Sequence, residues 1–321
     1  MTPPPCSRWL VLCAATALAC SGDPQPEATR GPDGAAALTP VKLALNWYPE
    51  PEFGGFYEGV LGGHYAQAGF EVEIVPGGPG APTLELLTAG RAQAAVTDAA
   101  DLLVKRQRGV KAVGAWPAFQ LNPQGLMVHA ASGITAIDQV PPGATVAIEQ
   151  GAPFQQFLWA RLGWEGSVRP VPYGGSVGPF IADPGFIQQA FITAEPCAAR
   201  AKGAEITFLK GSDVGWNPYG TLVAFADPPP PWADRFVAAT QAAWEAYMTA
   251  PARANAAIAQ ANDQLDPGLL ACITDAQRPF VTGSDGLGVM TQARWDTVAR
   301  DLVGIGLLPD GATADGAWIA R

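Results

Sequence analysis

The stretch from residue 41 to residue 75 reads VKLALNWYPEPEFGGFYEGVLGGHYAQAGFEVEIV. Its apolar opening, residues 41–46, predicts a short β-strand that ends in the loop WYPEPEFGG. Residues 56–68 carry a helical pattern, and residues 70–75 read as a second strand. A strand, a helix and a strand in this order form a βαβ unit, so we expect both strands to lie parallel in one sheet.

The same alternation continues along the chain. Further strands are expected at residues 94–96, 111–114, 126–129, 145–148, 168–171, 188–192, 205–208 and 221–225, and further helices at 83–89, 100–108, 154–162 and 196–201. Only helices are expected after these, at residues 232–249, 251–262, 267–280 and 291–305. Repeated βα units of this kind favour doubly wound α/β sheets with helices on both faces.

The pattern predicts two doubly wound α/β lobes with a ligand cleft between them, the arrangement expected of about 300 residues. We expect a signal segment at residues 1–20, a linker at 21–40, lobe I at 41–127 with 225–321, and lobe II at 128–224. The chain is expected to cross between the lobes near residues 126–129 and 221–225. Ligands of open α/β sheets sit beyond the carboxyl ends of the strands, so the cleft is the expected site, and it closes by a hinge.

The composition narrows the class of partner. The chain has 321 residues, 19 Lys and Arg against 29 Asp and Glu, and a formal net charge of −10. An acidic chain with no basic run argues against a nucleic-acid partner. Two His and five Cys leave little material for a metal site, and no cofactor is expected. No apolar run reaches the roughly 20 residues of a membrane-spanning helix.

The N-terminus has the pattern of an export address. One charge, Arg8, precedes an apolar run over residues 9–18, which is the length of a signal-peptide core. Small residues then lead to Cys20, a pattern that resembles a bacterial lipobox, although Ala17 stands where such boxes favour Leu. We therefore expect an exported, periplasmic chain whose only membrane contact is a lipid anchor at Cys20, with plain cleavage and secretion as the alternative. Residues 21–40 read as a flexible tether.

Two cysteines, Cys197 and Cys272, remain in the body of the chain. An oxidising compartment allows them to pair, but two cysteines do not define a disulfide framework. We expect two buried free thiols, with pairing as the alternative.

The common catalytic motifs are absent from the sequence: it contains no GxxxxGKS/T, GxSxG or HExxH run. The Gly-rich loop at residues 77–80 is either an anion-binding loop or a plain turn, and the turn is preferred. His64 and His129 are interpreted as structural. The pairs Asp98 with Asp101 and Glu50 with Glu52 are able to transfer protons, but for Asp101 a solvated surface position is expected. No catalytic residue is therefore expected.

Five short motifs between residues 41 and 310 carry a family resemblance. They are LNWYPEPEFGGFY at 45–57, LTAGRAQAAV at 87–96 with Thr97-Asp98, Ala194-Glu195-Pro196, WNPY at 216–219, and the tail GVM at 288–290 with Arg294, Trp295 and Leu302. In this order they resemble the type II solute-binding proteins of ABC importers, and most of all the branch that captures the pyrimidine precursor of thiamine. The resemblance implies an expected monomer that delivers a small heteroaromatic ligand to an ABC permease in the inner membrane.

The expected ligand site combines aromatic faces for stacking with polar groups that read the ring edge. The residues expected to bind are Asn46, Trp47, Tyr57, Thr97, Asp98, Phe154, Tyr173, Glu195, Asn217 and Tyr219. Glu195 is able to accept two hydrogen bonds from an amino-pyrimidine edge, or instead to cap the helix after it. For Trp47, Phe154 and Tyr173 the alternative is core packing.

Three alternatives for the function remain. Phe53 replaces the His that is usual in this branch, which leaves a larger flavin-like ligand open. Sulfonate and nitrate relatives share the fold and hold an anion on loop N–H groups, but an acidic cleft disfavours an anion. A pyrimidine-synthase type of enzyme also shares the fold, and it consumes its own His and a bound pyridoxal phosphate. Its Lys and His positions correspond to Thr97 and Asp101, and residues 215–218 replace its cysteine cluster, so a binding protein is the preferred interpretation.

Overall fold

The computed structural model describes Met1, residues 37–263 and residues 265–321. The expected signal segment, the lipobox-like Cys20 and most of the expected linker lie outside the described residues. Residues Leu38–Arg321 form one unit, and all that follows concerns this unit. No described helix combines the length and the apolar character that crossing a membrane requires.

The first sheet has five strands in the order β2-β1-β3-β10-β4. Their bounds are β1 Thr39–Ala44, β2 Phe70–Val75, β3 Ala94–Thr97, β4 Ala112–Phe119 and β10 Gly220–Ala226. Strand β1 pairs in parallel with both β2 and β3, as the βαβ pattern predicts. Strand β10 follows the strands of the second sheet in the chain, and it lies antiparallel between β3 and β4.

The second sheet repeats this plan in the order β7-β6-β8-β5-β9. Its strands are β5 Gln124–His129, β6 Thr145–Ile148, β7 Arg169–Pro172, β8 Ile187–Phe191 and β9 Ile206–Lys210. Strand β6 is parallel to β7 and β8, whereas β5 lies antiparallel between β8 and β9. The predicted α/β class is confirmed, and each sheet is mixed because the strand that follows a crossing enters it in the opposite direction.

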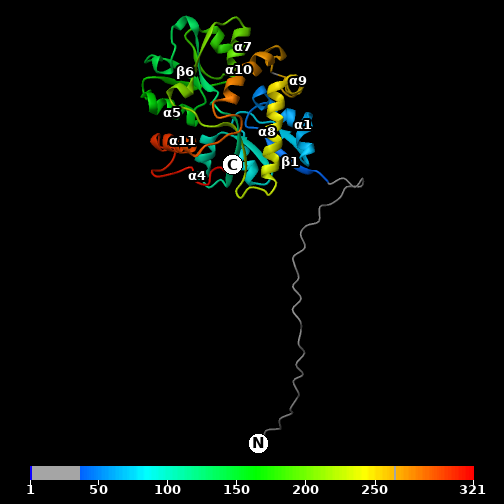
Figure 1. Cartoon of the computed structure of the whole chain (residues 1–321). Coiled ribbons are helices and arrows are strands. Elements are labelled where there is room, and N and C mark those ends of the chain that lie inside the picture. Colours follow the sequence, from blue (N-terminus) through cyan, green and yellow to red (C-terminus); the bar gives the residue numbers. More distant parts are fainter. Residues whose placement is uncertain (2–36, 264) are drawn as a thin grey trace. The chain divides into compact units, whose positions relative to one another are not determined.

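Helices fill most of the segments between the strands (Figure 1). The α-helices are α1 Gly54–Leu61, α2 His64–Gln67, α3 Thr83–Thr88, α4 Ala99–Gln107, α5 Pro153–Leu162, α6 Gly178–Ala182, α7 Glu195–Ala201, α8 Ala233–Thr249, α9 Ala252–Ala261, α10 Leu270–Thr282 and α11 Gln292–Gly304. The 3-10 turns are η1 Pro51–Phe53, η2 Ala130–Ser132, η3 Ile137–Gln139, η4 Gly211–Val214 and η5 Pro267–Leu269. The single helix expected over 56–68 is divided at Gly63, whose φ of 76° suits glycine alone among common residues.

Helix α1 and its preceding loop are fixed by aromatic residues of α8, and the two helices lie side by side (Figure 1). A Cβ atom at Gly54 would lie 2.0 Å from the Tyr247 ring, and one at Gly55 would lie 2.2 Å from Trp244. Both aromatic side chains are fully buried. The two glycines that open α1 therefore allow this direct packing against the backbone, which anchors residues 45–53 in front of the sheet.

The chain passes between the two sheets at residues 120–123 and 211–219. These crossings come a few residues before the expected boundaries at 127/128 and 224/225, because β5 and β10 each pair within one sheet along their length. The crossings touch each other: the Asn122 N–H donates to Asn217 Oδ1 over 2.9 Å. We call the first sheet with α1–α4 and α8–α10 the first lobe, and the second sheet with α5–α7 the second lobe.

Cys197 and Cys272 form a disulfide with Cα atoms 6.0 Å apart, so the expectation of two free thiols was wrong. Cys197 lies on α7 and Cys272 on α10. The two residues are 75 positions apart in sequence, and only the tertiary packing of these helices brings them together.

Candidate functional site

A cavity of about 400 Å³ lies where the carboxyl ends of the parallel strands of both sheets meet. Its walls come from the segments after β1, β3, β6, β7 and β8 and from both crossings. This is the position at which open α/β sheets bind ligands, and the volume suits a small molecule. The cleft expected from the strand pattern is therefore present as a cavity between the two sheets.

Asn46 and Trp47 line the cavity directly after β1. The carbonyl of Trp47 accepts a hydrogen bond from the Gly77 N–H over 3.1 Å, and a Cβ at Gly77 would lie 2.0 Å from the Leu45 carbonyl oxygen. Gly77 is thus required for close contact between two loops, and its N–H is not directed at an anion. Asn46 Oδ1 is buried and has no hydrogen-bond partner within the described chain, so it can accept from a ligand.

Three carboxylates from both lobes gather at one end of the cavity. Glu50 and Glu52 come from the first lobe, at and beside η1, and Glu195 comes from the second, at the start of α7. Burial, Glu52 and Glu195 raise the pKa of Glu50 well above its ordinary value. Burial and Glu195 raise the pKa of Glu52 to about 8. No Lys or Arg of the described residues forms an ion pair with any of the three carboxylates.

Glu195 is held in place by two protein donors. The Tyr173 hydroxyl donates to one carboxylate oxygen, and the Phe191 N–H donates to the other over 2.7 Å. The alternative role as a helix cap is not observed, because Ala194 occupies the N-cap and no side chain caps α7. Each oxygen of Glu195 retains lone-pair capacity for a further donor.

The opposite end of the cavity is also acidic, but it contains a cation. Asp98 caps α4 by accepting from the Asp101 N–H over 2.8 Å, and burial with the Asp101 charge raises its pKa to about 7. Asp101 pairs with Lys105 at 3.5 Å. Lys105 in turn pairs with Glu85 at 3.1 Å. Among the described residues Lys105 is the only Lys or Arg that lines the cavity, and its charge is already shared between two carboxylates.

Aromatic side chains complete the walls. The rings of Phe154 and Trp216 lie 5.7 Å apart, and both residues line the cavity together with Trp47 and Tyr173. The Trp216 indole N–H donates to Gln124 Oε1 over 3.1 Å, which fixes the ring at the second crossing. Aromatic faces with a few polar groups form the type of wall that binds a planar ring.

Six of the ten residues predicted from sequence line this cavity: Asn46, Trp47, Asp98, Phe154, Tyr173 and Glu195. Tyr57 does not, because it packs on α1 against the apolar core of the first lobe. Thr97 is the last, buried residue of β3, and its hydroxyl donates to Asp101 Oδ2 over 3.5 Å. It therefore lies one layer behind the wall.

Asn217 and Tyr219 were also predicted to bind, and the structure places both outside the main cavity. Asn217 Oδ1 accepts from the Asn122 N–H and from Arg294 at 3.1 Å, so the side chain joins the two crossings. The Tyr219 ring is buried under the Arg294 guanidinium at 3.9 Å, and its hydroxyl accepts from the Thr291 N–H. Asn217 lines a separate cavity of about 320 Å³ beside α11. Contacts from α11, distant in sequence, turn these side chains away from the site.

Several residues of the wall were not predicted. They are Asp101, Lys105, Asn122, Gln124, Glu149, Gln189, Phe191, Trp216 and Thr221, whereas Glu50 and Glu52 were expected among the acidic groups of the cleft. Asp101 was expected at a solvated surface, but it lies on the first turn of α4, and that turn faces the cavity. Thr221 has a φ of 44°, a strained value for a β-branched residue. The WNPY motif is the sequence signal for Trp216, which lines the cavity in place of Asn217 and Tyr219 of the same motif.

Neither histidine lines the cavity, in agreement with their structural interpretation. His129 Nε2 lies 2.7 Å from the Phe180 carbonyl oxygen and its ring stacks on Phe180, while His64 lies 4.0 Å from Glu58. The described residues contain no group of three or more His, Cys, Asp or Glu arranged to hold a metal ion.

Comparison with known families matches residues 50–254 to the family described as NMT1/THI5 like. This match covers more than half of the chain. A comparison with curated proteins found no sequence match.

Solved structures of the same fold cover nearly the whole body of the chain. The alkanesulfonate-binding protein SsuA from Xanthomonas axonopodis pv. citri, bound to MOPS, is similar with a TM-score of 0.66 and 14% identity, over 89% of this chain and 100% of that one. The periplasmic aliphatic sulphonate binding protein SsuA from Escherichia coli is similar with a TM-score of 0.62 and 15% identity, over 84% of this chain and 87% of that one. A ligand-binding component of an ABC-type import system from Staphylococcus aureus, with zinc bound, is similar with a TM-score of 0.61 and 12% identity. The match covers 88% of this chain and 97% of that one. These likenesses show the fold.

Proposed function

Because the chain belongs to the NMT1/THI5 like family, we propose that it is the substrate-binding component of an ABC-type importer. The family and the solute-binding fold agree with the expectation of a binding protein that is not an enzyme. The ligand binds in the cavity between the two lobes, which close on it by a hinge at the two crossings. An ABC permease in the inner membrane receives the ligand from the closed protein.

The proposed ligand is a small heteroaromatic ring with amino or cationic groups, such as the pyrimidine precursor of thiamine or a related amino-pyrimidine. The observation that carries this choice is the chemistry of the cavity wall. Glu50, Glu52 and Glu195 meet at one end without a cation, and Asn46 Oδ1 is a buried acceptor without a partner in the described chain. Donors on a planar ring satisfy these acceptors while Trp47 and Tyr173 provide faces for stacking.

Sulfonate is the second candidate, since two of the similar structures are named for sulfonate binding. The charges of this cavity argue against it. Lys105 is paired with Asp101 and Glu85, the Gly77 N–H donates to Trp47, and no Arg of the described residues lines the wall. An anion would face carboxylates with no free cation to offset their repulsion. A flavin is the third candidate, as Phe53 alters the expected family pattern.

Export to the periplasm, with a lipid anchor at Cys20, belongs to the same proposal. The disulfide between Cys197 and Cys272 supports it, because such bonds persist in oxidising compartments. The proposed protein is a monomer that reaches its permease from the membrane surface on its linker.

A thermal-shift screen of the chain tests the ligand class. The probes are 4-aminopyrimidines, riboflavin, ethanesulfonate and nitrate. A ligand at 100 times its dissociation constant adds about 2.7 kcal/mol to the free energy of unfolding, which raises the Tm by several degrees. We expect this increase with an amino-pyrimidine and its loss in Trp47→Ala and in Glu195→Gln.

Two variants serve as matched controls. Glu71→Gln removes an exposed carboxylate on β2 and should not change the shift, whereas Tyr48→Ala removes a ring that packs edge-on against Trp47 and should reduce the shift less than Trp47→Ala does. An increase with ethanesulfonate alone would contradict the proposed ligand while keeping the family. No increase with any probe would contradict the proposed binding of a small aromatic or anionic solute.

A further inference from the structure

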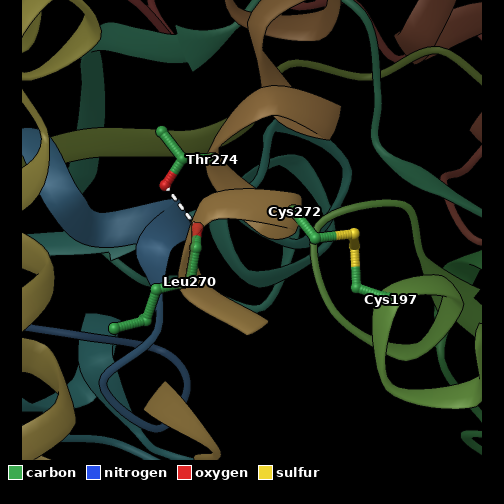
Figure 2. The surroundings of a disulfide bond; sticks show 4 residues. All are labelled: Cys197, Leu270, Cys272 and Thr274. Atoms are coloured by element: carbon green, nitrogen blue, oxygen red, sulfur yellow. Dashed lines mark hydrogen bonds between the residues drawn. A yellow bond between two sulfur atoms is a disulfide. The ribbon is translucent and has the colours of Figure 1, made fainter. Parts of the chain in front are cut away.

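The disulfide joins the two lobes at a point separate from the two crossings. Figure 2 shows Cys197 on the helix of the second lobe and Cys272 on the helix of the first, with the sulfur atoms bonded between them. Together with the crossings, the bond makes three covalent connections between the lobes within the described residues. The bond can limit the movement of the lobes only if Cys197 and Cys272 are each held firmly in their own lobe.

Cys272 belongs to a helix that is anchored firmly in the first lobe. Thr274 donates to the Leu270 carbonyl over 2.8 Å (Figure 2), and it accepts from Asn255 of α9 over 3.0 Å. Gln277, one turn further on α10, donates to the Pro51 carbonyl of η1 over 3.2 Å. These polar side chains are buried, so α10 moves with the first lobe and with the loop that carries Glu52.

Cys197 is anchored in the second lobe. Its side chain is buried, and α7 packs against β8 and β9. Ala199 of the same helix belongs to an apolar cluster with Met127 and Ala190, which lie on β5 and β8. Because Glu195 begins the helix, a displacement of α7 also displaces this carboxylate of the ligand cavity.

The lobes meet beside the disulfide through groups that repel one another. Glu50 and Glu52 of the first lobe face Glu195 of the second, and the direct polar contact is a 3.5 Å hydrogen bond from Thr193 to Glu52. The Tyr173 hydroxyl also faces this cluster, and the charge of Glu149, which lines the same cavity, acts on Tyr173. The pairs of Lys105 with Asp101 and Glu85 belong to the opposite end of the cavity. Ionisation of the cluster therefore pushes α7 away from η1.

We propose that the Cys197–Cys272 disulfide is a strap that holds α7 against the first lobe and prevents the two acidic walls of the cleft from separating. With the strap in place, the chain remains close to its binding geometry before a ligand arrives, so less free energy is needed for closure. Without the strap, carboxylate repulsion opens the cleft on this side. The inference concerns the cleft itself and holds for any ligand.

Hydrogen exchange without ligand tests the strap. The wild-type chain is compared with Cys197→Ser/Cys272→Ser at pH 8, by mass spectrometry of peptides that cover residues 46–53 and 192–200. We expect protection factors in both segments to fall about tenfold in the double variant, while peptides from β3 and β10 change little. At pH 5, well below the raised pKa of about 8 of Glu52, the repulsion across the cleft is weaker, so the double variant should regain part of this protection.

Val223→Ala is the matched control for a general loss of stability. Val223 is a fully buried residue of β10, distant in sequence from the strap. If the control lowers protection in the same two segments as much as the double variant does, the disulfide is only a stabilising cross-link and the strap is refuted. Equal protection in the wild type and the double variant at pH 8 would also refute it, as would two free thiols in the native wild type.

If the double variant does not fold, reduction of the disulfide in the wild-type chain provides a second test of the strap. Dithiothreitol reduces the disulfide of the folded wild-type chain: it supplies two electrons and two protons, Cys197 and Cys272 become thiols, and the reagent closes into its cyclic disulfide. The same loss of protection at residues 46–53 and 192–200 is expected after reduction. Unchanged protection in a chain shown by thiol alkylation to be reduced contradicts the proposal.

Discussion

The two lobes are joined in two places that differ in their physical chemistry. At the crossings, Arg294 of α11 donates to the Gln120 carbonyl and to the carbonyl and side chain of Asn217, so one cation satisfies acceptors from both connections. At the α7–α10 contact, carboxylates of both lobes face each other, no Lys or Arg of the described residues forms an ion pair with them, and a disulfide joins the two helices. A cross-link across about 75 residues stabilises a fold by about 4 kcal/mol.

The two connections therefore respond to different conditions. Hydrogen bonds around a buried guanidinium depend little on pH, because Arg remains charged. The carboxylate contact depends on pH, on the redox state of two cysteines and on the charge of whatever occupies the cavity. The crossings therefore define a hinge, and the α7–α10 side is where binding can be regulated.

The largest loss of stability is expected from a substitution that removes the hydrogen bonds at the two crossings. Arg294→Ala removes the donor to four backbone and side-chain acceptors and the cation above the Tyr219 ring. Buried acceptors left without a donor lower the free energy of unfolding by about 3 kcal/mol, to be measured by urea denaturation. Arg300→Ala, an exposed position on the same helix, is the control and should change little. Equal losses in both variants would show that the crossings do not depend on Arg294.

For each unit of pH, a smaller change in the free energy of unfolding is expected on the acidic side. The folded chain keeps Glu52 protonated up to about pH 8, whereas the unfolded carboxyl releases its proton near 4.5. Between these values the folded state binds more protons, so the free energy of unfolding falls as pH rises, by up to about 1.4 kcal/mol per pH unit. The contribution of Glu52 to the free energy of unfolding is complete below pH 4.5 and is lost above pH 8. Denaturation midpoints at pH 5, 6, 7 and 8 measure the slope.

Glu52→Gln should flatten this slope, and Asp98→Asn should flatten it only below about pH 7, where the folded pKa of Asp98 lies. Glu71→Gln, an exposed carboxylate of β2, is the control. A slope that stays the same in Glu52→Gln between pH 7 and 8 would show that the cluster does not drive the pH dependence.

The smallest effect concerns Thr221, which lies in the cavity wall just after the second crossing. Its φ of 44° is costly for a β-branched residue but free for glycine. Thr221→Gly should therefore be about 1 kcal/mol more stable than Thr221→Ala, which also loses the side chain but keeps the strained backbone. Thermal unfolding of both variants measures the difference, and the opposite order would show that the backbone is not strained there.

Most strands and helices of the fold could be predicted from local sequence patterns. Apolar periodicity and Gly or Pro breaks lie within short segments, so the strands at residues 70–75 and 145–148 were predicted with the bounds observed. The resemblance to solute-binding proteins, together with the rule that ligands bind beyond strand ends, led us to expect Asn46, Trp47, Asp98 and Glu195 at the site, and all four line the cavity. The export address and the lipid anchor at Cys20 remain predictions from the sequence.

The directions of the other side chains near the site depend on tertiary contacts and could not be predicted from the sequence. Tyr219 and Asn217 turn toward α11 because Thr291 and Arg294 bond them there, and Trp216 faces the cavity instead. The pairing of Cys197 with Cys272 likewise depends on the packing of α7 near α10. In each case the deciding partner lies about 70 or more residues away, and no local pattern of burial or turn residues specifies such a contact.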